Sequence, residues 1–139
     1  MKTKHILILL FAACLLFVAA GCTSSSPASV PAATSAPAPT FAGKWMTTWH
    51  GGGHDIPMTL TMSGSAVTGT YEYNTGTITG TETGDRLVGT WTENEGASKG
   101  PFEFVMSGDG KTFSGWWAYE GDDFAATKKE EPSWTGARA

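Results

Sequence analysis

The segment Leu87-Val88-Gly89-Thr90-Trp91 decides the fold that this chain predicts. An apolar residue, a glycine and an aromatic ring occupy alternate positions in it, and alternate side chains of a β-strand point to one face of a sheet. Five other segments have the same spacing, and most of them also end in an aromatic residue; they begin at Phe41, Val67, Ile78, Phe113 and Trp134. Each segment therefore predicts one strand with a buried face.

The central glycines of these segments are interpreted as determinants of the fold. A glycine on a buried face lets a sheet bend and coil, and it leaves room for the ring two residues further on. The positions concerned are Gly43, Gly69, Gly80, Gly89, Gly115 and Gly136. A tightly curled antiparallel barrel is the fold that requires such positions.

Eight strands are expected after residue 40, and no stretch there has helical periodicity. The predicted strands span residues 41–49, 56–63, 66–73, 77–83, 87–93, 102–107, 112–119 and 133–138. Short turn signals such as Ser63-Gly64-Ser65 separate them and favour antiparallel hairpins. The predicted fold class is all-β, an eight-stranded antiparallel up-and-down meander closed as a small barrel, because closure removes exposed edges. An open sandwich or a curled half-barrel is the alternative.

Residues 1–21 have the features of an export signal. Lys2 and Lys4 precede an apolar run over residues 6–20, which is too short for a comfortable membrane span. The run ends in Ala19-Ala20-Gly21-Cys22, which resembles the lipobox of lipoprotein signal peptides. The resemblance implies that Cys22 is lipidated and that the protein is exported and anchored to the cell membrane or envelope. The alternative is an ordinary signal peptide that is cut after another small residue.

The remaining chain divides into a tether and one domain. Residues 22–40 are rich in serine, alanine and proline, a composition typical of an extended, solvated linker. Residues 41–139 suffice for a single domain. This domain contains no cysteine, which excludes a disulfide framework. The formal net charge of the whole chain is −4, and the absence of a basic stripe argues against nucleic acid as a partner.

The domain resembles the calycin barrels, the group of lipocalins, fatty-acid-binding proteins and avidins. Gly43-Lys44-Trp45 is similar to the lipocalin Gly-x-Trp motif, and Arg138 lies near the chain end, where those barrels stack an arginine on that tryptophan. The segment from Val67 to Glu72 looks like the second-hairpin region of avidins. The resemblance implies a closed barrel that carries a ligand.

Two features limit what this resemblance implies about function. Avidins hold biotin through polar side chains, and here Met46, Thr47 and Tyr73 replace them, so that no biotin site is implied. The repeated glycine pattern also resembles a family of small secreted β-repeat domains without an established activity.

The candidate ligand-binding residues are aromatic residues with inward parity, which means that the alternation along their strands predicts a side chain facing the barrel interior. They are Trp45, Tyr71, Trp91, Trp117 and Trp134, and Tyr73 and Tyr119 share this parity. Aromatic-lined barrel mouths hold small hydrophobic ligands, but in so small a barrel the rings can also simply fill the core. The predicted function is non-enzymatic binding of a small apolar ligand or an envelope protein. The alternative is a structural or inhibitor-like surface module that acts through its rim loops and through Trp49 and Trp116, which are expected to be exposed.

Few residues suggest metal binding or catalysis, and neither an enzymatic activity nor a cofactor is expected. His50, His54 and Asp55 flank a glycine run and are weak metal-ligand candidates, although a plain flexible loop is the favoured interpretation. Glu82 and Glu93 have inward parity, but both lie near strand ends, where solvated charges are common. No Gly-x-Ser-x-Gly elbow or phosphate-binding loop occurs.

Overall fold

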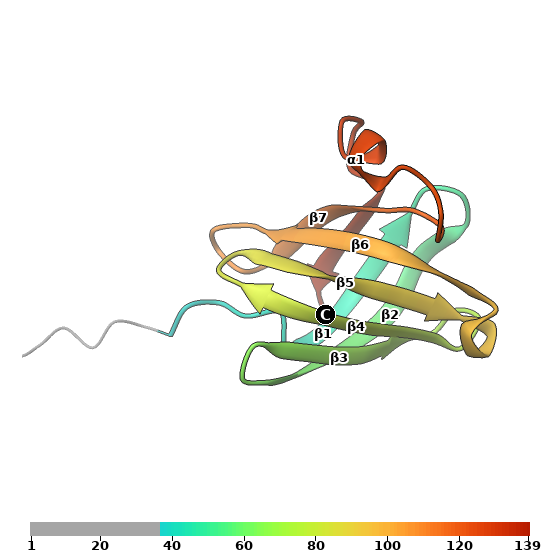
Figure 1. The fold of residues 1–139 in the computed structure, drawn as a ribbon. Coiled ribbons are helices and arrows are strands. Elements are labelled where there is room, and N and C mark those ends of the chain that lie inside the picture. Colours follow the sequence, from blue (N-terminus) through green and yellow to red (C-terminus); the bar gives the residue numbers. More distant parts are fainter. Residues whose placement is uncertain (1–36) are drawn as a thin grey trace, which may run out of the picture. The chain divides into compact units, whose positions relative to one another are not determined.

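The chain forms a closed barrel of eight antiparallel strands, which confirms the predicted fold class (Figure 1). The computed structural model describes residues 37–139, so the predicted signal peptide, Cys22 and most of the tether lie outside the described residues. The strands are β1 (Gly43–Trp49), β2 (Gly53–Ser63), β3 (Ala66–Tyr71), β4 (Gly76–Thr83), β5 (Arg86–Glu93), β6 (Ser98–Met106), β7 (Thr112–Trp117) and β8 (Trp134–Arg138). Each strand pairs with the next, and β8 pairs with β1, which excludes the open sandwich.

Strand boundaries differ from the predicted ones mainly around glycine, proline and turn residues. Strand β6 begins at Ser98 rather than at residue 102, and its Gly100 and Pro101 pair with residues of β5. Strand β3 ends at Tyr71 rather than at residue 73, because a turn follows in which Asn74 and Thr75 both have positive φ. Strand β7 ends at Trp117 rather than at residue 119.

Two short helices lie outside the predicted meander. The 3₁₀ turn η1 (Asn94–Gly96) joins β5 to β6, and helix α1 (Phe124–Thr127) lies in the long loop between β7 and β8. Asp123 caps α1 by accepting a hydrogen bond from the amide of Ala126. Neither element is long enough to show a helical period in the sequence. Within residues 37–139, no helix has the length and apolarity that crossing a membrane requires.

The repeated glycines lie where neighbouring strands approach closely. A Cβ atom at Gly69, Gly89 or Gly115 would overlap a backbone oxygen of the adjacent strand. At Gly136 the obstacle is instead the ring of Phe113. The sequence pattern predicts neighbouring rings as the obstacle throughout, but the backbone of the adjacent strand is the obstacle at most of these positions, because the strands of this barrel coil closely past each other.

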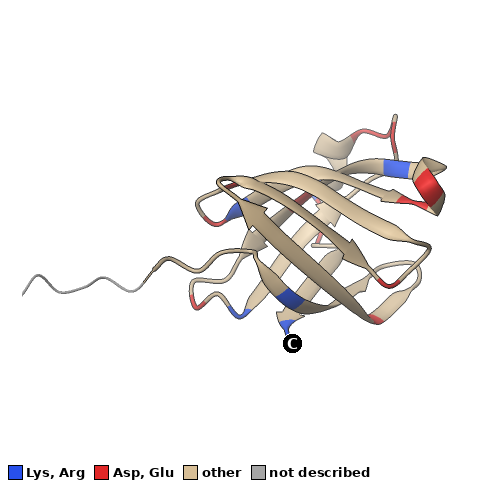
Figure 2. Ribbon diagram, turned by 90° about the horizontal axis from the view of Figure 1, so that it is seen from below, with Lys and Arg blue, Asp and Glu red and all other residues tan. Residues whose placement is uncertain are grey.

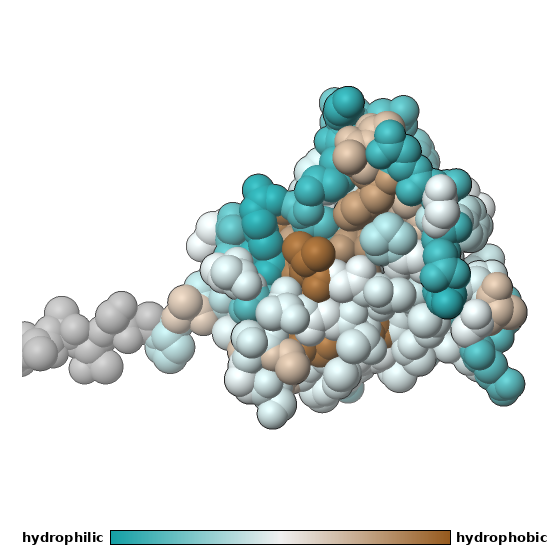
Figure 3. Space-filling view, viewed as in Figure 1, coloured by the Kyte–Doolittle hydropathy of each residue, from teal (hydrophilic) through white to brown (hydrophobic). Residues whose placement is uncertain are grey.

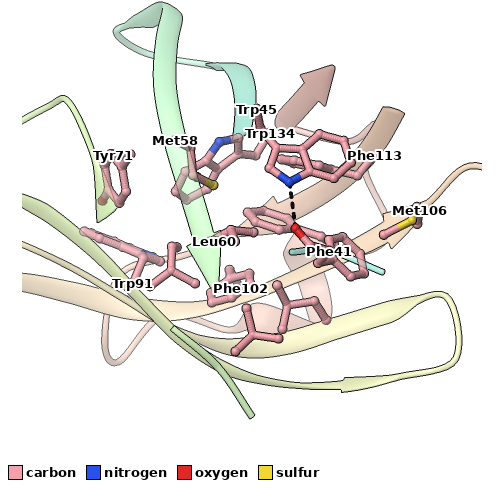
Figure 4. Packing of buried hydrophobic residues seen from close by; sticks show 14 of the residues in the cluster. Phe41, Trp45, Met58, Leu60, Tyr71, Trp91, Phe102, Met106, Phe113 and Trp134 are labelled. Carbon is pink, nitrogen blue, oxygen red and sulfur yellow. Dashed lines mark hydrogen bonds between the residues drawn. The ribbon is translucent and has the colours of Figure 1, made fainter. Parts of the chain in front are cut away.

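The interior of the barrel is filled by side chains (Figure 4). Its fully buried residues include Phe41, Trp45, Met58, Leu60, Val67, Ile78, Leu87, Phe102 and Phe104. Phe104 stacks on Phe113, with ring centroids 4.3 Å apart. A packed core of this kind leaves no lumen for a lipid chain inside the barrel.

One end of the barrel, here called the floor, is closed by Phe41 and Arg138. The indole nitrogen of Trp45 donates a hydrogen bond to the carbonyl of Phe41 at 2.8 Å, drawn as the dashed line in Figure 4. Arg138 lies over the ring of Trp45, 4.3 Å from the centroid, and donates to the carbonyl of Ala42. The amide of Phe41 donates to Glu82, so that the inward carboxylate predicted on β4 has a structural partner.

The outer wall of the barrel is mainly polar. Figure 3 shows the side formed by β3 to β6 as mostly of intermediate hydropathy, with hydrophilic residues along its edges and apolar atoms near its centre. Threonines face outward in register, for example Thr70 opposite Thr59 and Thr77. This distribution agrees with the predicted outer face of the repeated segments.

Candidate functional site

The second end of the barrel, here called the mouth, is open and differs from the floor in composition. Four loops surround it, at residues 50–52, 72–75, 94–97 and 118–133. They gather at the end of the barrel opposite to the point where residues 37–42 reach the first strand (Figure 1). A cavity of about 250 Å³ opens between these loops. The mouth is therefore the candidate functional site.

Aromatic side chains from opposite walls line the mouth. The lining rings are those of Trp49, Tyr73, Trp91, Trp117, Tyr119 and Trp134. Trp49 belongs to β1 and Trp91 belongs to β5, strands that lie across the barrel from each other in a closed meander of eight strands. The polar residues of the lining are His50, Asn74, Glu93, Asn94 and Ser98. A flat apolar group inside the cavity would thus meet rings on both sides.

Three of these rings form one corner of the cavity. The ring planes of Trp91 and Trp117 are 89° apart, and their centroids are separated by 5.5 Å. Tyr119 completes the set, at 71° to Trp91 and 81° to Trp117. Edge-to-face pairs of this kind are favourable in themselves, because the positive edge of one ring meets the negative face of the other.

Glu93 is the acidic group of the mouth, and it is held by neutral donors. The hydroxyl of Tyr71 donates to one carboxylate oxygen at 2.9 Å, and the side-chain amide of Asn74 donates to the other at 3.1 Å. Burial raises the pKa of Tyr71, and its bond to Glu93 raises that pKa further. Tyr71 therefore remains protonated and acts as a donor throughout the physiological range.

Two tryptophans at the mouth have indole N–H groups that find no partner among the described residues. The indole nitrogen of Trp91 donates to the carbonyl of Ala118 at 3.1 Å. Within residues 37–139, the buried indole nitrogens of Trp117 and Trp134 find no acceptor. Buried donors are nearly always hydrogen-bonded in native proteins, so these two groups are exceptions within the described residues.

The loop 118–133 is fixed against the barrel wall, which gives the mouth a defined shape. Lys128 and Arg86 both pair with Glu103, a carboxylate that is buried on the outer side of β6. The indole of Trp116 donates to the carbonyl of Glu130 at 2.9 Å. Sequence reasoning missed this cluster, because Glu103 has the parity of a solvated outer residue.

The structure places the predicted ligand-binding residues at two ends of the barrel, the mouth and the floor. Trp91, Trp117 and Trp134 line the mouth, and Tyr71 supports it through Glu93. Trp45 lies at the floor, packed on Phe113 with centroids 5.1 Å apart, and is absent from the cavity lining. The structure thus places Trp45 in the core, apart from the predicted ligand-binding residues at the mouth.

The expected exposure of Trp49 is wrong, whereas Trp116 lies on the outer face, as expected, and is partly exposed. Trp49 is 8% exposed and packs against Trp134 with centroids 5.2 Å apart. Its position two residues beyond Thr47 and four beyond Trp45 gives it inward parity, a signal that its glycine-rich neighbourhood obscured. Trp116 is half-buried by its contact with the loop 118–133. Neither ring is a free rim residue.

The weak metal candidates do not converge. His50 lies at the mouth, whereas His54 and Asp55 belong to β2, which begins at Gly53. No group of three or more histidine, cysteine or carboxylate side chains within residues 37–139 is arranged to hold a metal ion. The two inward carboxylates are not a pair either, since Glu82 lies at the floor and Glu93 at the mouth.

Comparison with known proteins leaves the geometry as the basis for a functional assignment. The chain matches no protein-family model, no curated protein and no solved structure.

Proposed function

We propose that this protein is a non-enzymatic binding protein of the cell envelope, anchored through a lipid on Cys22, which holds a small ligand in its mouth. The observation that carries the proposal is the cavity of about 250 Å³ with six aromatic residues in its lining. Concave sites with aromatic walls and a few polar groups are the usual form of small-molecule sites. The loop contacts of Lys128 and Trp116 pre-form the site, which lowers the entropic cost of binding.

The dimensions of the site define the kind of ligand. The core beneath the mouth is filled by residues such as Phe102 and Phe104, so a long acyl chain has no space to enter the barrel. The cavity instead suits a compact group with apolar faces and one or two polar atoms. The apolar faces would contact the rings, and the polar atoms would meet Glu93, Asn74 and Ser98.

Tryptophan fluorescence tests the proposed site. When a panel of small aromatic and amphipathic probes is titrated into the protein, we expect the emission to change with a Kd below about 100 μM, roughly 5 to 6 kcal/mol of binding free energy. A Trp91→Leu variant should lose at least about tenfold in affinity, because it removes a ring of the cavity corner. Val88→Ala is the matched control, since Val88 is on the outer face of the same strand, is 49% exposed and lies outside the cavity lining. If no probe binds, the proposal fails.

The proposed anchor has a separate test. A Cys22→Ser variant expressed with a radiolabelled lipid precursor should lose the label and move from the membrane fraction to the soluble fraction, because the acylated thiol would be missing. A single acyl chain anchors a protein to a membrane only marginally. Complete retention of the unmodified protein in the membrane fraction is therefore expected to require more than one acyl chain. Equal labelling and membrane retention of the variant and the unmodified chain would contradict lipidation at this residue.

A further inference from the structure

We propose that the ligand of the mouth is a small organic cation with a methylated ammonium group and a nearby hydroxyl, of which choline is the simplest member. This inference rests on the proposed function and names the ligand class for the same site. It follows from three independent properties of the mouth: the arrangement of its rings, the sign of its charge and the polar groups of its lining.

The ring arrangement is suited to a cation. Aromatic faces carry negative quadrupole potential, and cages of several rings are the usual recognition sites for quaternary ammonium groups. Trp91, Trp117 and Tyr119 stand at 71° to 89° to each other, so their planes form a corner rather than a stack. Trp49 and Tyr73, whose planes are 80° apart, line the same cavity from the β1 side.

The charge of the mouth has the matching sign. Among residues 37–139, no lysine or arginine lies within ion-pair distance of Glu93, the half-buried carboxylate in the lining. Because a partly buried charge is stabilised by a counter-charge, Glu93 favours a ligand that carries a positive charge.

The loops around the mouth extend this negative field. Figure 2 shows several acidic residues and a basic stretch at the end of the barrel opposite to the N-terminal segment, and acidic and basic residues at the other end. The acidic residues of the mouth loops are Glu72, Glu95, Glu120, Asp122, Asp123, Glu130 and Glu131. The basic residues of this region are Lys99, which pairs with Glu120 at 3.1 Å, Lys128, which pairs with Glu103, and Lys129. This excess of acidic groups would attract cations to the mouth.

The hydrogen bonds of Glu93 favour a methylated ammonium over a primary one. Tyr71 and Asn74 already donate to its two oxygens. A primary ammonium is strongly hydrated and needs several acceptors when it leaves water. A trimethylammonium group donates no hydrogen bond, so it requires only the negative charge and the ring faces that this cavity offers.

Polar groups of the lining account for the hydroxyl. His50, Asn94 and Ser98 line the cavity and offer hydrogen-bonding atoms. The hydroxyl oxygen of choline lies two carbons from the ammonium nitrogen and supplies an acceptor that tetramethylammonium lacks. A hydrogen bond to one of these groups would favour choline between the two cations.

A series of related ligands on the purified full chain tests the inference. Calorimetric titrations would compare choline, tetramethylammonium and 3,3-dimethyl-1-butanol, the neutral isostere of choline. We expect choline to bind at least about tenfold more tightly than the neutral alcohol, because the isostere lacks the charge that the rings and Glu93 attract. Choline should also bind more tightly than tetramethylammonium. Equal affinity of choline and the neutral alcohol would overturn the cation assignment while the binding mouth itself would stand.

Two variants locate the bound cation. Glu93→Gln keeps acceptor and donor atoms for Tyr71 and Asn74 but removes the charge, so it should weaken choline about tenfold and leave the neutral alcohol within about twofold. Glu131→Gln, on the loop but outside the cavity lining, is the matched control and should change neither affinity by more than about twofold. Unchanged choline binding by Glu93→Gln would place the cation elsewhere and overturn the inference. If this variant does not fold, the comparison of choline with the neutral alcohol on the unmodified chain still tests the cation assignment.

The same head group occurs as a free solute and on a lipid, and the experiment separates these sources. The acidic loops favour a ligand with a net positive charge, so phosphocholine should bind more weakly than choline, and vesicles of phosphatidylcholine should not retain a Cys22→Ser chain. Preferential capture by such vesicles would overturn the assignment to a free cation. Absence of binding by every cation and every neutral probe would overturn both the inference and the proposed function.

Discussion

A Trp45→Ala variant is expected to lose about 3 to 5 kcal/mol of unfolding free energy, the range for removing a large aromatic side chain from a core. Trp45 is 0% exposed and packs on Phe113 with centroids 5.1 Å apart. The substitution would also leave the carbonyl of Phe41 without its indole donor and Arg138 without the ring beneath it. Chemical denaturation followed by fluorescence of the remaining tryptophans measures the loss.

Met46→Ala is the matched control for this prediction. Met46 is the next residue of β1, points outward and is 38% exposed, so its truncation should change stability by no more than about 0.5 kcal/mol. The comparison also separates the floor from the mouth. Any Trp45→Ala protein that remains folded should bind mouth probes with unchanged affinity, because Trp45 is absent from the cavity lining. Similar denaturation midpoints for Trp45→Ala and Met46→Ala would mean that the floor of the barrel is not tightly packed.

The barrel could be predicted from the sequence because one local signal recurs along it. Leu87, Gly89 and Trp91 share a face, and the same alternation of apolar residue, glycine and ring appears in other strands. The signal failed where local conformation deviates from a regular strand. Gly100 and Pro101 obscured the start of β6, although both are paired with β5. A proline or glycine inside a strand weakens the pattern without preventing the pairing.

The mouth could be predicted only in part, because it depends on which end of each strand a residue occupies. Parity alone places Trp45 and Trp91 on the same inner face, but Trp45 lies opposite Arg138 at the floor and Trp91 lies opposite Gly100 near the mouth. In an up-and-down meander, odd-numbered strands begin at the floor and end at the mouth. Trp45 near the start of β1 and Trp91 near the end of β5 could have been separated on this basis. The bond between Tyr71 and Glu93 joins residues 22 positions apart and required the register of three strands.

The long loop between β7 and β8 could not be predicted, because its anchors are tertiary. Glu103 lies on β6, and its partners Arg86 and Lys128 come from β5 and from the loop. No spacing in the sequence connects a strand carboxylate with a lysine 25 residues further on. The position of Tyr119 in the aromatic corner depends on the path of this loop, so this part of the site emerges only from the folded structure.

A Gly89→Val variant is expected to destabilise the barrel by about 1 to 3 kcal/mol, the range for overpacking. A Cβ at this position would lie 2.5 Å from the Cα of Gly80 and against the carbonyl of Thr79 on β4, and backbone atoms cannot rotate away as a side chain could. Thr90→Val, on the outer face of the same strand, should be nearly neutral because the two side chains have similar shapes and strand propensities. Gly108→Val makes the same chemical change where no atom lies within 4 Å of the added Cβ, so it should cost less than Gly89→Val. Equal denaturation midpoints for the two glycine variants would show that close strand approach at Gly89 does not determine the fold.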